Sequence, residues 1–140
     1  MPRKKIIVSV LICLIVVVSV APVYATIGGG SDAGVFALCY RDAKATLAIA
    51  SDGTATARGS ITGLVGTTTK TTVHLYLQKY KNGDWEDVDD WILSNDSVST
   101  SIEKSKSVEK GYKYRAKASC YAYSGTKCEH VTKYSAEVSY

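Results

Sequence analysis

The 140-residue sequence has little of several residue types, with two prolines, two histidines, one phenylalanine and one methionine. Both prolines come before residue 23, so later turns must rest on glycine, asparagine and aspartate. After residue 25 no uncharged apolar run approaches the roughly 18 residues of a membrane-spanning helix. No acid–base pair, nucleophile triad or standard metal-ligand spacing stands out. The sequence therefore predicts a protein that is not an enzyme and has no cofactor, no metal and no stable membrane anchor.

The N-terminus has the pattern of a secretory signal peptide. Arg3, Lys4 and Lys5 precede an uncharged apolar run that Pro22 ends. At about 16 residues this run is shorter than a membrane span. Small residues follow at the positions that a signal peptidase reads, which predicts cleavage after Ala25. We expect a signal-peptide helix over 1–25, a flexible glycine-rich leader over 26–36, a single domain over 37–140, and secretion from the cell.

The basic charge of the chain belongs mostly to this targeting segment. The whole sequence has 17 basic and 13 acidic residues, a net charge of +4. Arg3, Lys4 and Lys5 leave with the signal peptide, so the remaining chain is close to neutral. The charge therefore gives no reason to expect a nucleic acid as partner.

After the leader, apolar and polar residues alternate with a period of two. Glycine-containing turn signals separate the alternating segments: Asp52-Gly53, Gly63 to Gly66, Asn82-Gly83, Lys110-Gly111 and Ser124-Gly125. Short strands at this spacing are typical of an antiparallel sandwich. The sequence thus predicts an all-β fold, an antiparallel immunoglobulin- or fibronectin III-like β-sandwich of about seven strands.

Asn82-Gly83 is the most informative of these turns. Both central positions of a type I′ turn need a positive φ, which Asn-Gly adopts readily. A two-residue loop here pairs Tyr80 with Trp85, Gln78 with Asp87 and Leu77 with Val88. Because Leu77 and Val88 are both apolar, this register predicts a core pair.

Residues 108–116, with the sequence VEKGYKYRA, resemble the turn before strand F of fibronectin type III and related immunoglobulin-like domains. In that turn an apolar residue and a glycine precede a tyrosine whose hydroxyl folds back onto the chain. Val108, Gly111 and Tyr114 match those three residues, and Lys110 stands where the motif often has proline. The resemblance implies a structural corner at these residues.

The chain from Ala45 to Tyr140 also resembles a group of short secreted proteins from Gram-positive bacteria. The features that carry this resemblance are Thr54-Ala55-Thr56-Ala57, Leu77-Gln78-Lys79, Gly83-Asp84-Trp85, Gly111 to Lys117 and Val131-Thr132-Lys133-Tyr134-Ser135. The resemblance implies export and a common fold, and it implies no activity.

Three cysteines remain after signal cleavage: Cys39, Cys120 and Cys128. Outside the cell they are expected to oxidise, and the odd number leaves one over. A three-residue turn at Tyr123-Ser124-Gly125 places Cys120 opposite Cys128 and favours a disulfide between them, whereas a two-residue turn places them on different faces. Pairing of Cys39 with either is the alternative. The remaining cysteine is either buried or joins two chains, which predicts a monomer or a Cys39-linked dimer.

Aromatic residues gather on the outer face of the predicted hairpin. Tyr76, Tyr80 and Trp85 share this face, and Tyr121 and Tyr123 point outward from the strand that the hairpin is expected to join. By the same alternation Trp91 either extends the patch or folds under an edge. Flat rings can stack on sugars or anchor a protein, although cross-strand pairing alone also accounts for them.

Charged residues form an acidic cluster over 84–90 and a basic counterpart over 104–117. Alternation places Asp87 and Asp89 on the same side of their strand. Both clusters are interpreted first as solvated faces, paired within or between molecules.

We interpret the protein as a secreted, non-catalytic binding module for an extracellular glycan or surface protein. One alternative is a structural or matrix protein that self-associates through sheet edges or the odd cysteine. Another is a secreted effector or toxin-like protein.

Overall fold

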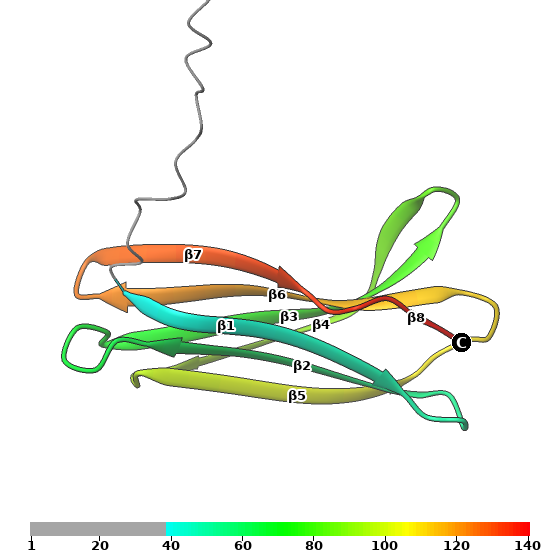
Figure 1. Cartoon of the computed structure of the whole chain (residues 1–140), viewed down its shortest axis with the longest axis horizontal. Coiled ribbons are helices and arrows are strands. Elements are labelled where there is room, and N and C mark those ends of the chain that lie inside the picture. Colours follow the sequence, from blue (N-terminus) through cyan, green and yellow to red (C-terminus); the bar gives the residue numbers. More distant parts are fainter. Residues whose placement is uncertain (1–38) are drawn as a thin grey trace, which may run out of the picture. The chain divides into compact units, whose positions relative to one another are not determined.

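The computed structural model describes residues 39–140, and the predicted signal peptide and leader lie outside these residues. The strands within the described residues are β1 (Tyr40–Ile49), β2 (Thr54–Gly63), β3 (Lys70–Lys81), β4 (Asp84–Asn95), β5 (Ser99–Ser107), β6 (Lys113–Ser124), β7 (Lys127–Tyr134) and β8 (Val138–Ser139). One sheet has the order β1-β2-β5 (Figure 1). The other has the order β4-β3-β6-β7, and β8 pairs with β6 where β7 has ended.

These two antiparallel sheets form a β-sandwich, which confirms the fold class predicted from the sequence. The alternation that predicted the strands also separates an inner from an outer face on each sheet. No helix within residues 39–140 is long and apolar enough to cross a membrane.

The core between the sheets is built from medium and small side chains. Ile61 of β2 and Val73, Leu75 and Leu77 of β3 are fully buried, together with a row of alanines on β2 and β6. Gly59 lies where the two sheets approach closely, because a Cβ there would stand 2.8 Å from Val73 Cγ1 on the facing sheet. The alanine-rich core therefore holds the two sheets close together.

The Asn82-Gly83 turn forms as predicted, with φ values of 55° and 94°. Tyr80 pairs with Trp85 and Gln78 with Asp87, as expected. The next pair differs from the prediction, because Leu77 lies opposite Asp89 rather than Val88. Val88 is an extra residue in β4 and forms a β-bulge. Strict alternation of apolar and polar residues does not predict such a bulge.

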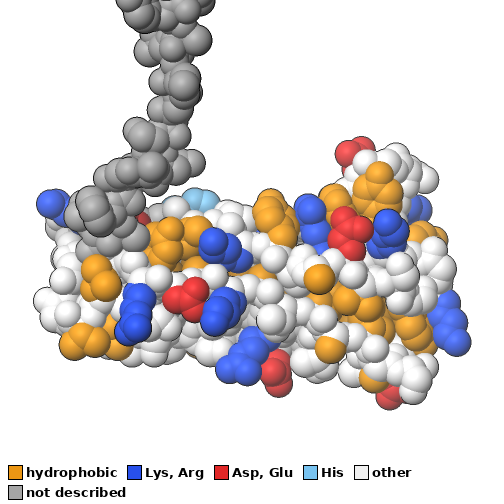
Figure 2. Space-filling model, viewed as in Figure 1, with side chains coloured by type: hydrophobic (Ala, Val, Ile, Leu, Met, Phe, Trp, Pro, Cys, Tyr) orange, Lys and Arg blue, Asp and Glu red, His pale blue; other side chains and the backbone are white. Residues whose placement is uncertain are grey.

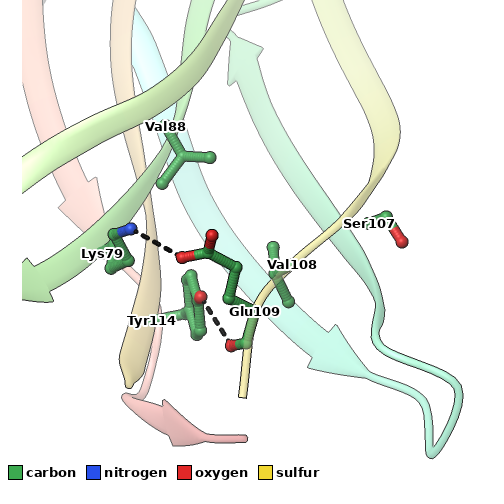
Figure 3. A pocket seen from close by; sticks show the side chains of 6 residues that line it. All are labelled: Lys79, Val88, Ser107, Val108, Glu109 and Tyr114. Atoms are coloured by element: carbon green, nitrogen blue, oxygen red, sulfur yellow. Dashed lines mark hydrogen bonds and ion pairs between the residues drawn. The ribbon is translucent and has the colours of Figure 1, made fainter. Parts of the chain in front are cut away.

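The corner implied by residues 108–116 is present. The hydroxyl of Tyr114 donates a hydrogen bond of 2.8 Å to the backbone carbonyl of Glu109, and Gly111 has a φ of 90° (Figure 3). Tyr114 is fully buried, and burial is the main cause that raises its pKa. Val108 lies beside Tyr114 in the lining of a hollow of about 220 Å³. The corner thus attaches the β5–β6 connection to the core.

The predicted disulfide between Cys120 and Cys128 is wrong. The β6–β7 turn has two residues, since Ser124 pairs with Lys127. Cys120 therefore lies opposite Val131 and points into the core, whereas Cys128 lies opposite Tyr123 and is exposed. Cys39 is buried. All three thiols are free, and only Cys128 is accessible to a second chain.

The corner hydrogen bond gives a first prediction. Tyr114→Phe keeps the buried ring but leaves the Glu109 carbonyl without its donor, so the free energy of unfolding should fall by about 1–2 kcal/mol. Urea denaturation measures it. Tyr112→Phe is the matched control, because the Tyr112 ring keeps its contact with Lys79 Nζ, 4.5 Å from the ring centroid. Equal stability of the two variants would contradict the role of the corner.

The thiols give a second prediction. Burial raises the pKa of Cys120 to about 11 and also raises the pKa of Cys39, so both remain protonated and shielded near pH 8. Iodoacetamide should label Cys128 alone in the folded protein, and Cys39 and Cys120 only after unfolding in guanidinium. Mass spectrometry of the peptides reads the result, and rapid labelling of Cys120 in the native state would contradict this placement.

Candidate functional site

The outer face of the five-stranded sheet holds all five aromatic residues proposed from the sequence. β3 contributes Tyr76 and Tyr80, β4 contributes Trp85, and β6 contributes Tyr121 and Tyr123. They do not form one patch. Lys113 of β6 pairs with Tyr80, whereas Tyr123 pairs with Lys70, so the two ends of the face are about 30 Å apart at 3.3 Å per residue.

At the hairpin end, Tyr80 and Trp85 form a tilted ring pair. Their centroids are 5.2 Å apart and their planes make an angle of 53°. On β6, the guanidinium of Arg115 lies between two rings, with its Cζ 4.1 Å from the centroid of Trp85 and 4.3 Å from that of Tyr134. The result is a layer of Trp85, Arg115 and Tyr134 that extends from β4 to β7.

The β-bulge explains how Trp85 reaches Arg115 across the intervening strand β3. A bulge bends its strand and increases the local twist. Between Val88 and the Asn82-Gly83 turn, the end of the β3–β4 hairpin rises out of the sandwich on the side of β6 and β8 (Figure 1). This bend brings the Trp85 ring, on an edge strand, over the side chains of the central strand β6.

A hollow lies at the raised hairpin, and we name it the hairpin site. Its lining residues are Tyr80, Trp85, Lys113 and Glu137. Its volume is about 300 Å³. Lys113 Nζ and a Glu137 carboxylate oxygen form an ion pair of 3.5 Å in the lining of this hollow, and both side chains are more than half exposed. Figure 2 shows hydrophobic, basic and acidic side chains interleaved on the hairpin and the surface below it.

A buried amide holds the arginine of this layer in place. Gln78 is 6% exposed although it faces outward. Its Oε1 accepts a 2.8 Å hydrogen bond from Arg115 Nε, and its Nε2 donates one of 2.8 Å to Asp87. Arg115 is therefore fixed by a hydrogen bond at its edge and by rings on its faces, which orients the Trp85 wall of the hairpin site.

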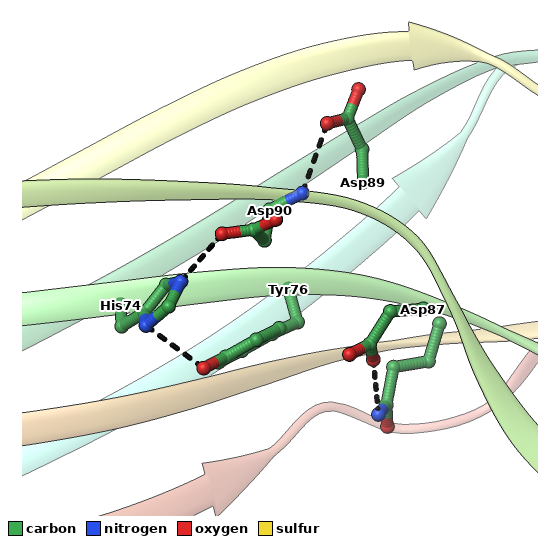
Figure 4. Close-up of polar contacts among 6 residues, drawn as sticks. His74, Tyr76, Asp87, Asp89 and Asp90 are labelled. Atoms are coloured by element: carbon green, nitrogen blue, oxygen red, sulfur yellow. Dashed lines mark hydrogen bonds and ion pairs between the residues drawn. The ribbon is translucent and has the colours of Figure 1, made fainter.

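The middle of the face carries a chain of hydrogen bonds around His74. Its Nε2 lies 2.6 Å from Asp90 Oδ2, and its Nδ1 lies 2.8 Å from the hydroxyl of Tyr76 (Figure 4). Burial raises the pKa of Tyr76, and Asp87 and Asp90 raise it further. Lys117 Nζ lies 4.5 Å from the Tyr76 ring centroid. These groups satisfy one another and hold Tyr76 in place.

The far end of the face is separate from the hairpin site. Tyr121 stacks on His130 of β7 with a centroid distance of 4.6 Å. Tyr123 lies beside Lys70, 5.7 Å from its centroid, and burial is the first cause that raises the pKa of Tyr123.

The bulge also changes which way the acidic residues point. Asp87 faces outward toward Gln78, whereas Asp89 lies 2.6 Å from Lys106 of β5, so the prediction that both share one side is wrong. Lys106 is the main cause that lowers the pKa of Asp89. Trp91 packs against the core and so does not extend the aromatic face.

No protein-family model matches the chain, and no curated protein matches it. Among solved structures, the solution structure of R. palustris CsgH has a TM-score of 0.38 and 11% sequence identity, covering 66% of this chain and 90% of that chain. A crystal structure of a protein from Archaeoglobus fulgidus has a TM-score of 0.33 and 10% identity, covering 72% of this chain and 97% of that chain. At these values neither likeness carries an inference about function.

Several residues in and around the hairpin site were not predicted from the sequence to belong to a binding site. Lys113 and Arg115 fall on outward positions of their strand, so alternation could have placed them beside Tyr80 and Trp85. Tyr134 of β7 lies directly opposite Lys117 of β6, so its side chain points to the same outer face as that of Lys117. Glu137 lies in the connection between β7 and β8, and no sequence signal marks the switch by which β8 takes the edge of β6.

Arg115 gives a third prediction. Arg115→Ala removes the side chain between Trp85 and Tyr134 and its bond to Gln78, so unfolding should become easier by about 1–2 kcal/mol. The near-ultraviolet circular dichroism should also change as the Trp85 ring loses its partner. Lys117→Ala is the control, since Lys117 contacts one ring only. An unchanged spectrum for Arg115→Ala would contradict the layered arrangement.

Proposed function

We propose that this protein is a non-catalytic extracellular binding module that holds a glycan in the hairpin site. The observation that carries the proposal is the hollow itself, whose lining combines two aromatic rings with an exposed ion pair. Residues 1–25 support the extracellular location through their signal-peptide pattern.

The chemistry of the four lining residues suits a sugar ring. A pyranose has apolar C–H faces, which stack on aromatic rings, and a rim of hydroxyls that both donate and accept hydrogen bonds. Tyr80 and Trp85 supply the stacking surface. Lys113 supplies donors and Glu137 supplies acceptors. Such a combination favours a neutral sugar over a purely apolar or a strongly charged ligand.

The site is also prepared before a ligand arrives. Arg115 is held by Gln78 and Tyr134, and in turn it backs the Trp85 ring. Ordering a flexible side chain on binding costs about 0.5–1.5 kcal/mol, so a Trp85 ring that is already fixed avoids part of this cost.

The polar groups near the site favour binding over catalysis. His74 is the one histidine on this part of the face, and both of its ring nitrogens are engaged, by Asp90 and Tyr76. None of these three residues lines the hairpin site, so they are not positioned to act on a ligand held there. The carboxylate in the site, Glu137, is exposed and paired with Lys113.

The fourth prediction tests this function by glycan microarray followed by calorimetry with the best ligand. Trp85→Ala should weaken binding at least about tenfold, since a central aromatic anchor typically contributes about 2 kcal/mol. Tyr121→Ala, an aromatic residue on the same face but outside the hairpin site, is the matched control and should bind like the original protein. Glu137→Gln should weaken binding while leaving the rings in place.

Two results would overturn the proposal. Equal affinity of Trp85→Ala and the original protein would remove the hairpin site from consideration. Absence of glycan binding, with capture of one surface protein that Trp85→Ala fails to capture, would keep the site but change the class of ligand.

A further inference from the structure

The edge strand β4 has two halves with different surface chemistry. The half near the hairpin turn carries the acidic residues Asp84, Glu86, Asp87, Asp89 and Asp90 and the bulge. The other half, Trp91–Asn95, has no charge and no bulge. Its apolar side chains remain accessible, with Ile92 65% and Leu93 36% exposed. Charges and bulges protect edge strands from pairing with other chains, and only the first half has them.

The backbone groups of this uncharged half are directed away from the sheet. Residues that flank a two-residue turn form a hydrogen-bonded pair, and such pairs alternate along β3 from Lys81 onward. Trp91 and Leu93 therefore bond to β3, while the N–H and C=O groups of Ile92 point outward. The 2.9 Å bond from Asp90 N–H to the Asp89 carboxylate agrees with this orientation, because it shows that the Asp90 N–H is not bonded to β3 (Figure 4).

A hollow of about 290 Å³ lies beside this half, between the two sheets. Its lining includes Ile92 and Leu93 of β4 and Ile102 of β5. β4 pairs only with β3, and β5 only with β2, within residues 39–140. Two uncovered strand edges and an apolar hollow thus lie on the same side of the sandwich.

We propose that the uncharged half of β4 pairs with the same half of a second copy of this chain, antiparallel and with the two-fold axis at Ile92. Ile92 then forms a hydrogen-bonded pair with Ile92 of the second copy, which covers the most exposed apolar side chain of this strand. Asp90 lies opposite Ser94 of the second copy, and Trp91 opposite Leu93. A two-fold contact of this kind closes on itself and ends at a dimer.

The charges of β4 select this register over its neighbours. With the axis at Asp90, the two copies of Asp90 would face each other, and like charges directly opposite are destabilising. With the axis at Leu93, Asp90 would face Asp96 of the second copy. At Ile92 no acidic residue faces another, and the acidic half of each strand lies beyond the uncharged half of the other.

Pairing at Ile92 also has a consequence that rests on the function proposed above. An antiparallel pair of identical strands keeps the outer faces of both sheets on the same side. The two hairpin sites would then face the same way, about 40–45 Å apart along β4 at 3.3 Å per residue. A dimer with this geometry could bind two sugars of one polysaccharide, with a gain in avidity.

Sedimentation velocity over a range of protein concentrations, with reducing agent to exclude a Cys128 disulfide, tests the pairing. The protein should sediment as a dimer at high concentration. Ile92→Lys, which adds charge at the axis, and Ser94→Pro, which removes an outward N–H, should both shift it to a monomer. Val65→Lys is the control, because Val65 is an apolar residue 90% exposed in the β2–β3 loop and is not part of β4. Circular dichroism confirms that each variant is folded.

A monomer at every concentration would overturn the proposal, as would a dimer that Ile92→Lys and Ser94→Pro leave unchanged. Ligand binding provides a separate readout. Ile92→Lys should still bind a single sugar at the hairpin site, and Trp85→Ala should still dimerise, so failure of either proposal is distinguishable from failure of the other.

Discussion

The single extra residue in β4 shapes the outer surface of the five-stranded sheet at its hairpin end. Without Val88, β3 and β4 would continue as a regular ribbon in the plane of their sheet. With it, the strand bends, the hairpin rises over the outer face, and Trp85 meets Arg115 on a strand that it does not neighbour. Because the extra residue shifts the alternation counted along the sequence, Asp89 points toward Lys106 although Asp87 faces outward, and Trp91 packs against the core although Trp85 does not. One local irregularity therefore separates an aromatic site from a packed interior.

The bend is tolerated because contacts on both faces of the hairpin hold it. On the outer face, Gln78 connects Arg115 with Asp87 across three strands. On the inner face, Lys79 Nζ lies 3.2 Å from a carboxylate oxygen of Glu109, next to the Tyr114 corner. The Glu109 bond is the main cause that raises the pKa of Lys79. The corner thus anchors the end of the sandwich from which the hairpin projects, and the hairpin site depends on elements far apart in sequence.

Alternation and turn chemistry were enough to predict the sandwich, the Asn82-Gly83 hairpin and the outward direction of Tyr76, Tyr80 and Trp85. They failed where the chain departs from a period of two. The bulge has no glycine or proline to mark it, so the Leu77–Val88 pair and the shared side of Asp87 and Asp89 were wrong. The two-residue turn before Lys127 places Cys120 and Cys128 on opposite faces, whereas the sequence favoured a three-residue turn that would have placed them opposite each other. Contacts that skip a strand, such as Trp85 with Arg115, have no signature in the sequence.

Deletion of Val88 tests most directly whether the bulge builds the site. The deletion leaves every β3–β4 residue pair in place but removes the kink, so the sandwich should stay folded. In a Trp91→Phe background the fluorescence of Trp85 reports its surroundings. Deletion of Val88 is expected to expose Trp85, to shift its emission to longer wavelength and to make that emission insensitive to Arg115→Ala. Emission that is unchanged by the deletion, in a protein that remains folded, would contradict the account.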